Sequence, residues 1–184
     1  MEKYVQLRPK LRRLFRRTAA GERGVTMIEF ALVLPFLVVL FIGLVEFAEA
    51  FTVMRKLSMA AHTVSDLVAQ EPSVDTAELN DVSLVADEIL KPYGTGPLTI
   101  VIVSVVSDVD NAATVAWSHP ASAYVPGTAY ALPEAALTDP NTSLIVAEAT
   151  YDFTPTVSRF LGSFQMNERG FFRPRFTQTV LKLD

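Results

Sequence analysis

The chain has 184 residues, half of them hydrophobic, and it contains no cysteine. This length allows one modest globular domain plus a membrane segment, and the absence of cysteine excludes disulfides and thiolate metal sites. The net charge of −4 is unevenly distributed: residues 1–24 carry eight Lys or Arg against two Glu, a net charge of +6, which leaves −10 for residues 25–184. A basic N-terminal segment followed by an acidic remainder indicates how the chain is oriented in a membrane more directly than it indicates a binding partner.

A long apolar run follows the basic head. Residues 30–45 contain no polar side chain, and Glu29 and Glu46 bound the run. Apolar residues on both flanks extend it to the roughly 20 residues that a transmembrane helix needs. Because nothing polar interrupts the run, it predicts a transmembrane helix over residues 25–48 rather than the buried helix of a soluble protein.

The flanking charges predict the orientation of this helix. The positive-inside rule keeps the basic leader, residues 1–24, in the cytoplasm, so the C-terminal part is expected on the far side of the inner membrane, in the periplasm. Tyr4 and Phe15 are the leader's aromatic residues, fewer than nucleic-acid binding usually requires. Topology and contact with anionic lipid explain the charge better, and no nucleic-acid partner is expected.

A short motif joins the leader to the apolar run. Gly24 is followed by Val25, and Glu29 with Phe30 opens the apolar helix. Insertion of a charged residue at the centre of a membrane helix costs about 2.5–3.5 kcal/mol of free energy, and less near the helix end. A carboxylate at the start of the span therefore suggests that it has a function. If the chain were cut after Gly24, the new α-amine of Val25 would lie one turn from Glu29 on the same helix face.

This motif resembles that of type IV pilin-like precursors, and more closely that of the TadE/TadF-like pseudopilins of tight-adherence (Flp-type) pilus systems. The resemblance is carried by residues 24–35, 46–48, 151–155 and 172–176. It implies that a prepilin peptidase cuts between Gly24 and Val25, leaving a mature chain of 160 residues. It also implies that Glu29 and Phe30 act in assembly, Glu29 by pairing with the α-amine of its own or a neighbouring subunit. The implied partners are the prepilin peptidase, other pilin-like subunits, the inner-membrane assembly platform and the lipid bilayer.

A second cleavage pattern lies at the end of the apolar run. The tripeptide Ala48-Glu49-Ala50 resembles an ordinary signal peptidase site, which would release residues 51–184 as a soluble protein. The apolar run is longer than the core of a normal signal peptide, and the helical pattern continues past the site. The sequence therefore favours a chain that stays anchored.

Helical periodicity continues beyond the apolar run. Apolar residues recur at steps of three and four at Phe47, Phe51, Met54, Leu57, Ala61, Val64 and Val68. This stripe predicts one helix from about residue 26 to about residue 70, ended by Pro72, with residues 49–72 as a periplasmic extension. The stripe is either a docking face for the exported domain or a face between subunits. Asp75 and Glu78 resemble a capping box and predict a second helix that ends near Leu90.

From residue 98 the pattern changes to β. The predicted strands are residues 98–107, 113–118, 143–153, 163–172 and 175–182, with a turn at 108–111 and a Pro- and Ala-rich loop over 119–142. Helices followed by strands predict an α+β fold. In this fold the long N-terminal transmembrane helix continues into the periplasm and packs, with a short second helix, against a small antiparallel β-sheet. The periplasmic α+β domain is expected to span residues 73–184.

The sequence offers little support for catalysis. His62 and His119 are the only histidines and lack the spacing of metal ligands, and no G-x-S-x-G motif occurs. Neither an enzyme activity, a cofactor nor a metal site is expected. Asp108 and Asp110 lack the Gly and distal Glu of an EF-hand loop; a hairpin turn explains them, and calcium binding there is left open.

These observations predict a minor pseudopilin of a tight-adherence pilus system, held in the inner membrane and associated with pilus assembly. The alternative is a single-pass, membrane-anchored periplasmic scaffold or binding protein that never enters a fibre. A tethered hydrolase is a third possibility, for which the sequence shows no nucleophile–base pair.

Overall fold

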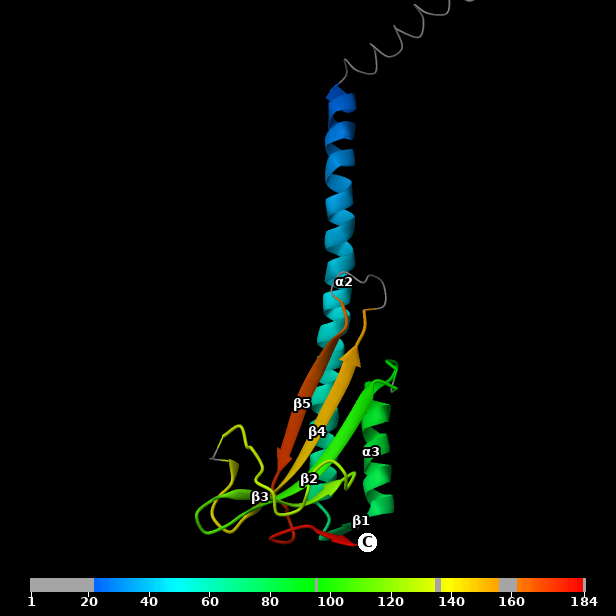
Figure 1. The fold of residues 1–184 in the computed structure, drawn as a ribbon. Coiled ribbons are helices and arrows are strands. Elements are labelled where there is room, and N and C mark those ends of the chain that lie inside the picture. The colour runs from blue at the N-terminus through cyan, green and yellow to red at the C-terminus, as the bar shows by residue number, and fades with distance from the viewer. Residues whose placement is uncertain (1–21, 95, 135–136, 156–161, 184) are drawn as a thin grey trace, which may run out of the picture. The chain divides into compact units, whose positions relative to one another are not determined.

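The computed structural model describes residues 22–94, 96–134, 137–155 and 162–183, so most of the predicted leader lies outside the described residues. The elements, in chain order, are α2 (Glu22–Ala69), β1 (Ser73–Asp75), α3 (Thr76–Leu90), β2 (Leu98–Ser107), β3 (Ala113–His119), β4 (Ser143–Phe153), β5 (Phe164–Phe172) and β6 (Leu181–Leu183) (Figure 1). The chain divides into two compact units whose boundary lies within α2, between Phe47 and Ala48. The predicted α+β class is confirmed.

The part of α2 after Ala48 docks on the sheet through one face. Phe51 and Met54, two members of the predicted stripe, are exposed, whereas Val53 is fully buried. The stripe is therefore a docking face only beyond Met54. Its fully buried members are Leu57, Ala61, Val64 and Val68.

Helix α3 begins at the predicted capping box. The Asp75 carboxylate accepts a hydrogen bond from the Glu78 main-chain N–H at 2.8 Å, and the Glu78 carboxylate accepts one from the Asp75 main-chain N–H at 2.9 Å. These two bonds satisfy donors that every helix start leaves unpaired. At the other end of α3, the Lys56 ammonium of α2 donates to the carbonyl oxygen of Ile89 at 2.9 Å and to that of Lys91. One lysine thus ties the C-terminus of α3 to α2.

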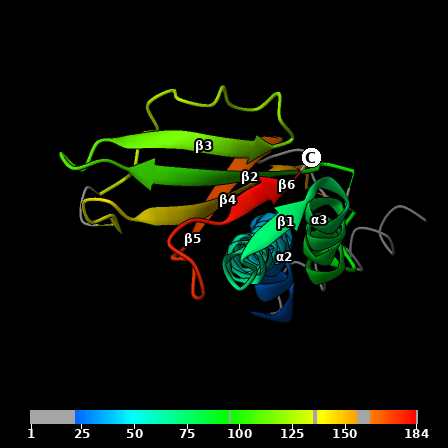
Figure 2. The same ribbon diagram turned by 90° about the horizontal axis from the view of Figure 1, so that it is seen from below.

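Four strands form an antiparallel sheet in the order β3-β2-β4-β5, with both helices on one side of it (Figure 2). Successive residues of a strand point to opposite faces, and β4 shows this clearly. Ile145 and Ala147 belong to the main core shared with the helices, whereas Leu144 and Val146 belong to a second apolar cluster.

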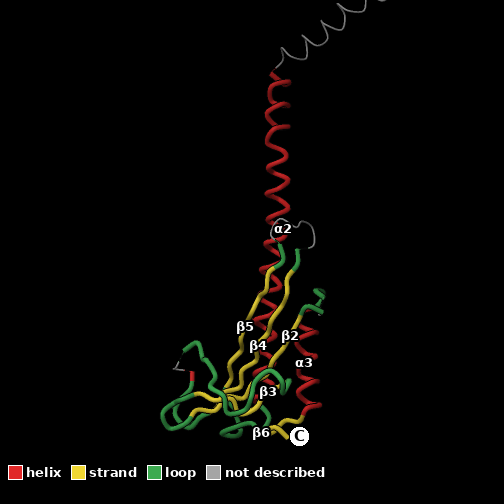
Figure 3. Tube along the Cα trace, viewed as in Figure 1, coloured by secondary structure: helices red, strands yellow, loops and turns green. Residues whose placement is uncertain are grey.

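The second cluster is covered by the segment between β3 and β4, which Figure 3 draws mostly as loop, with one short helical piece at Leu137. The sequence predicts this Pro- and Ala-rich segment as a loop, and it is one, but it also packs on the sheet. Val115 of β3 exchanges main-chain hydrogen bonds with Gly127 and Thr128 of the loop. The loop side chains that complete the cluster are Tyr124, Tyr130, Leu132 and Leu137.

The predicted strand over residues 175–182 is mostly wrong. Only Leu181–Leu183 forms a strand, β6, which pairs in parallel with β1. The residues before it cross the end of the domain and bond to partners other than a strand: the Arg175 N–H donates to the Ala69 carbonyl at 2.9 Å, and the Trp117 indole N–H donates to the Val180 carbonyl at 2.8 Å. Pro174 has no N–H to donate to a ladder, and side-chain pattern alone does not reveal such long-range partners.

Candidate functional site

The predicted cleavage bond lies at the start of α2. The helix begins at Glu22, so the Gly24–Val25 peptide bond belongs to its first turn. Gly24 is half-buried and Val25 is exposed. The structure places this bond at the surface of the chain, in helical conformation.

Glu29 and Phe30, the predicted assembly residues, lie one turn further along α2. Both side chains are exposed. Val25 and Glu29 are four residues apart in a continuous helix, which places them on one face at a rise of about 6 Å. The structure therefore brings together the two residues that the cleavage hypothesis pairs, while Phe30 points to a neighbouring part of the helix surface.

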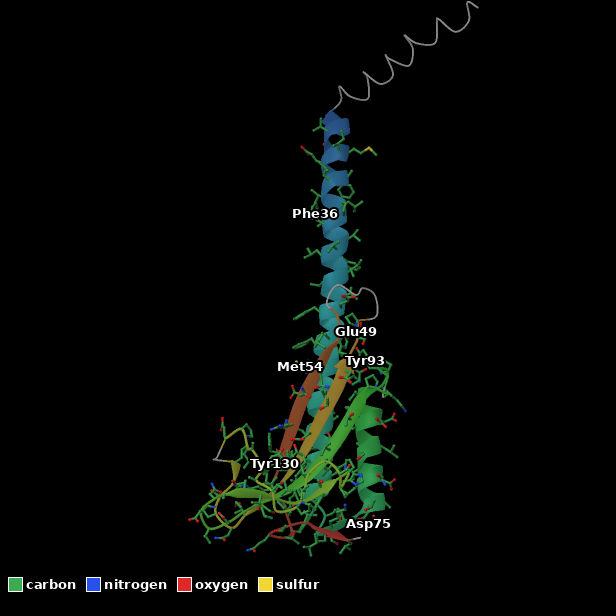
Figure 4. The ribbon with its side chains drawn as sticks, viewed as in Figure 1. Phe36, Glu49, Met54, Asp75, Tyr93 and Tyr130 are labelled. Atoms are coloured by element: carbon green, nitrogen blue, oxygen red, sulfur yellow. The ribbon has the colours of Figure 1, made fainter. Side chains whose placement is uncertain are left out.

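The span that follows is apolar on all sides. Among the described residues one helix, Gly24–Ala69, is long and apolar enough to cross a membrane, with a mean hydropathy of 2.8 over its most apolar stretch, none of which is buried. Figure 4 shows side chains projecting all around it, Phe36 among them. The helix continues through Pro35. Exposed apolar side chains on every face are costly in water and suited to lipid.

The helix also runs without interruption through the second cleavage pattern. Residues 48–50 lie inside α2, and the helix ends at Ala69 rather than at the end of the apolar run. Glu46, which bounds the run in the sequence, is fully buried. The predicted continuation of the helix past Ala50 is thus confirmed.

The residues considered for metal binding have structural partners. One carboxylate oxygen of Asp108 accepts hydrogen bonds from the main-chain N–H groups of Asp110 at 2.9 Å and Ala112 at 2.8 Å, which shapes the β2–β3 turn. His62 packs edge-on against Phe172, with ring centroids 6.3 Å apart. Within the part of the chain that the structure describes, no group of three or more His, Asp or Glu residues gathers as metal ligands would.

His119 links β3 to α3. Its Nε2 atom lies 3.1 Å from the Asn80 side-chain oxygen, and burial together with the nearby Lys182 ammonium lowers the pKa of this histidine. The same lysine donates a hydrogen bond to the Ser118 carbonyl. His62 and His119 therefore have separate, structural surroundings.

The structure also contains a polar cluster that the sequence pattern does not predict. Glu148 of β4 accepts hydrogen bonds from the hydroxyls of Tyr124 at 2.9 Å and Tyr130 at 2.7 Å, and Arg169 of β5 lies 3.3 Å from the same carboxylate. Burial, followed by the hydrogen bond to Glu148, raises the pKa of the Tyr130 hydroxyl far above its ordinary value. The cluster fastens the β3–β4 loop to the sheet. The sequence feature that could have indicated this cluster is a glutamate, Glu148, between the apolar residues of a predicted strand.

Over the residues that the structure describes, the fold and the span together define a class: a protein with a candidate membrane anchor that carries an α+β domain. Residues 24–66 match the family model described as TadE-like protein. The match covers 43 of the 184 residues and begins at Gly24. It confirms the resemblance to this family for residues 24–66. No curated protein and no solved structure gives a significant match.

Proposed function

We propose that the protein is a minor pseudopilin of a tight-adherence pilus system, processed by a prepilin peptidase after Gly24 and contributing to pilus assembly. The observation that carries the proposal is the TadE-like match, which begins at Gly24 and continues through the apolar span. The proposed role is assembly rather than catalysis. Its partners are the peptidase, other pilin-like subunits and the inner-membrane assembly platform.

The proposed topology follows from charge. Residues 1–24 carry a net charge of +6, which favours retention on the cytoplasmic side of the inner membrane. The α+β domain, on the other side of the span, then lies in the periplasm. This orientation puts Gly24 at the cytoplasmic end of the span.

The residue types at the cleavage bond suit a peptidase. Gly24 has no Cβ atom, so an enzyme can approach its main chain closely. Val25 is 55% exposed, so its side chain is accessible from the helix surface. Because the bond lies in the first turn of α2, only a short stretch of helix has to open for the bond to enter an active site.

The Glu29 carboxylate is a partner for the α-amine that cleavage would create at Val25. After cleavage, Val25 is the first residue of α2, and a carboxylate one turn later also interacts favourably with the positive end of the helix dipole. In low-dielectric surroundings a charge with no partner is strongly unfavourable. Pairing of Glu29 with the α-amine of its own chain or of a neighbouring subunit would fix the axial position of one helix against the next.

The N-terminus of the protein recovered from membranes tests the proposal. Mass spectrometry is expected to show a chain that begins at Val25. The Gly24→Leu variant should keep its leader, and the matched Gly21→Leu variant should be processed normally. A wild-type chain that begins at Met1, or at Phe51 as the signal peptidase pattern would give, would overturn the processing step.

Piliation tests the assembly role separately. Cells that lack the protein should lose surface pili, and expression of the wild-type chain should restore them. Unchanged piliation of the cells that lack the protein, together with a wild-type chain that is processed to Val25, would overturn the assembly role and favour the membrane-anchored scaffold.

A further inference from the structure

The exported domain has an end that must lie close to the bilayer whatever the angle between the domain and the span. Glu49 follows Val45, the last residue of the apolar run, by four residues in one continuous helix. The rise of an α-helix is 1.5 Å per residue, so Glu49 lies about 6 Å along the helix axis beyond Val45. Whatever packs beside Glu49 is therefore held near the membrane surface.

Two other segments of the domain pack beside Glu49. A cavity of about 360 Å³ is lined by Glu49, by residues 92–94 of the turn after α3, and by residues 151–154 at the end of β4. Figure 4 shows Glu49 and Tyr93 at this end of the domain. The end of β4 carries Phe153, whose ring lies 5.3 Å from that of Phe164, the first residue of β5. The adjoining ends of β4 and β5 therefore lie at the level of the first turns of α2 after the span.

Large apolar side chains are exposed at this end. In α2, Phe51 is 53% exposed and Met54 48%, and in β5, Phe164 is 42% exposed. Exposed Phe and Leu side chains on a surface that lies against a membrane insert at the boundary between head groups and acyl chains. Arg55, also exposed, lines a shallow groove with Phe51, and a long basic side chain in such a place can reach lipid phosphates.

We propose that this end of the exported domain rests on the lipid bilayer, with Phe51 and Phe164 inserted at the boundary between head groups and acyl chains. The domain then has a second membrane contact besides its span. The occupant is lipid because Glu49 and Phe51 follow the apolar span within two turns of the same helix. Glu49 and Asp152 lie at the same end, so the contact depends on apolar insertion and not on attraction to anionic lipid.

This contact restricts how the domain moves. A domain joined to the membrane by a single helix can tilt freely, whereas insertion of a side chain from β5 fixes a second point. The direction in which the sheet faces a neighbouring subunit is then set by the membrane itself. The proposal rests on the single-span anchor and not on the pilus role.

The experiment uses the full chain reconstituted in phosphatidylcholine vesicles, with and without bromine on the acyl chains, which quenches nearby tryptophan. The single native Trp117 is retained, and its emission is measured in the wild type. Three variants are compared: Phe51→Trp, Phe164→Trp and, as the matched control, Phe176→Trp. Phe176 is 76% exposed and follows Arg175, which bonds to Ala69, about 30 Å along α2 from Glu49.

Brominated lipid should quench the added emission at least twofold in the Phe51→Trp and Phe164→Trp variants and leave the Phe176→Trp variant unchanged. Quenching of the Phe51→Trp variant without quenching of the Phe164→Trp variant would overturn the proposal, because Phe51 is near the bilayer through the helix alone. Equal quenching of all three would also overturn it. Thermal unfolding of each variant checks that the domain is folded, and the N-terminal sequence tests the processing step independently.

Discussion

Gly170 of β5 lies directly against the main chain of Ala61 in α2. A Cβ atom added to Gly170 would overlap the Ala61 carbonyl group and stand 2.5 Å from the Ser65 hydroxyl oxygen. Ser65 turns this hydroxyl back into its own helix, where it donates to the Ala61 carbonyl at 2.8 Å. The helix and the sheet therefore meet at a point where neither side has room for a methyl group.

Substitution of Gly170 by alanine should destabilise the domain. Overpacking of a filled core costs about 1–3 kcal/mol, and more where main-chain atoms must move. The matched control is Gly96→Ala, because a Cβ there has no atom within 4 Å. Denaturant unfolding of the full chain in detergent, followed by Trp117 emission, should show a lower midpoint for Gly170→Ala and a midpoint close to wild type for Gly96→Ala. Equal midpoints would contradict the close approach.

Lys56 should contribute more to stability than the exposed ion pair next to it. Its ammonium donates to two carbonyl groups at the C-terminus of α3, where a cation also interacts favourably with the helix dipole. Hydrogen bonds to a charged group contribute about 1.5–3 kcal/mol, so Lys56→Met should lower the unfolding free energy by about 1–3 kcal/mol.

Lys91→Met is the matched control for Lys56. Lys91 pairs with Glu88 at 2.6 Å, but both side chains are more than 60% exposed, and such pairs contribute about 0–1 kcal/mol. The same unfolding measurement compares the two variants. A larger loss for Lys91→Met than for Lys56→Met would show that Lys56 does not hold α3 in place.

The sequence predicts the elements of this fold well where the signal is local. The capping box at Asp75 and the strand over residues 143–153 each depend on neighbours a few positions apart, and both are confirmed. The contacts that join elements have no such signal. The sequence alone does not show that Gly170 must be small, because that depends on the approach of α2. It also does not show that the Tyr130 hydroxyl donates to Glu148, because the loop and β4 are far apart in the chain.

The candidate site shows the same division. Gly24, Val25 and Glu29 are candidates that the resemblance to pilin-like precursors supplies from the sequence, because the chemistry proposed for them is local to one helix turn. The position of the exposed Phe164 could not be predicted from the sequence, because it depends on the pairing of β4 with β5 and on the packing of the end of β4 around the cavity beside Glu49.

Tyr130 should make the domain sensitive to alkaline pH. Burial and the hydrogen bond to Glu148 raise its pKa in the folded chain above the ordinary value of about 10, so the native state holds this proton more tightly than the unfolded state does. Its contribution to stability is complete below about pH 10 and is lost as the pH rises towards the folded pKa. Tyr130→Phe removes this titration and also costs about 1 kcal/mol at neutral pH through the lost hydrogen bond.

Unfolding free energies measured between about pH 8 and about pH 11 test this dependence. Stability of the wild type should fall above about pH 10, and that of Tyr130→Phe should fall less steeply. Tyr124 also bonds to Glu148, and burial raises its pKa too, so Tyr124→Phe should reduce the slope in the same direction. Identical slopes in all three proteins would contradict the assignment.

Replacement of Glu29 by valine should leave the span in the membrane and impair pilus assembly. Valine makes the start of the span more apolar, so insertion is not weakened. If Glu29 pairs with an α-amine, loss of a charge-assisted bond of about 1.5–3 kcal/mol lowers an assembly equilibrium about ten- to hundred-fold. Membrane fractionation should show normal amounts of the variant, and electron microscopy should show few or no pili.

The matched control is Glu71→Val, because Glu71 is an exposed glutamate just beyond α2. Cells that carry this variant should be piliated normally. Normal piliation of Glu29→Val, with normal processing after Gly24, would mean that the carboxylate has no part in subunit stagger.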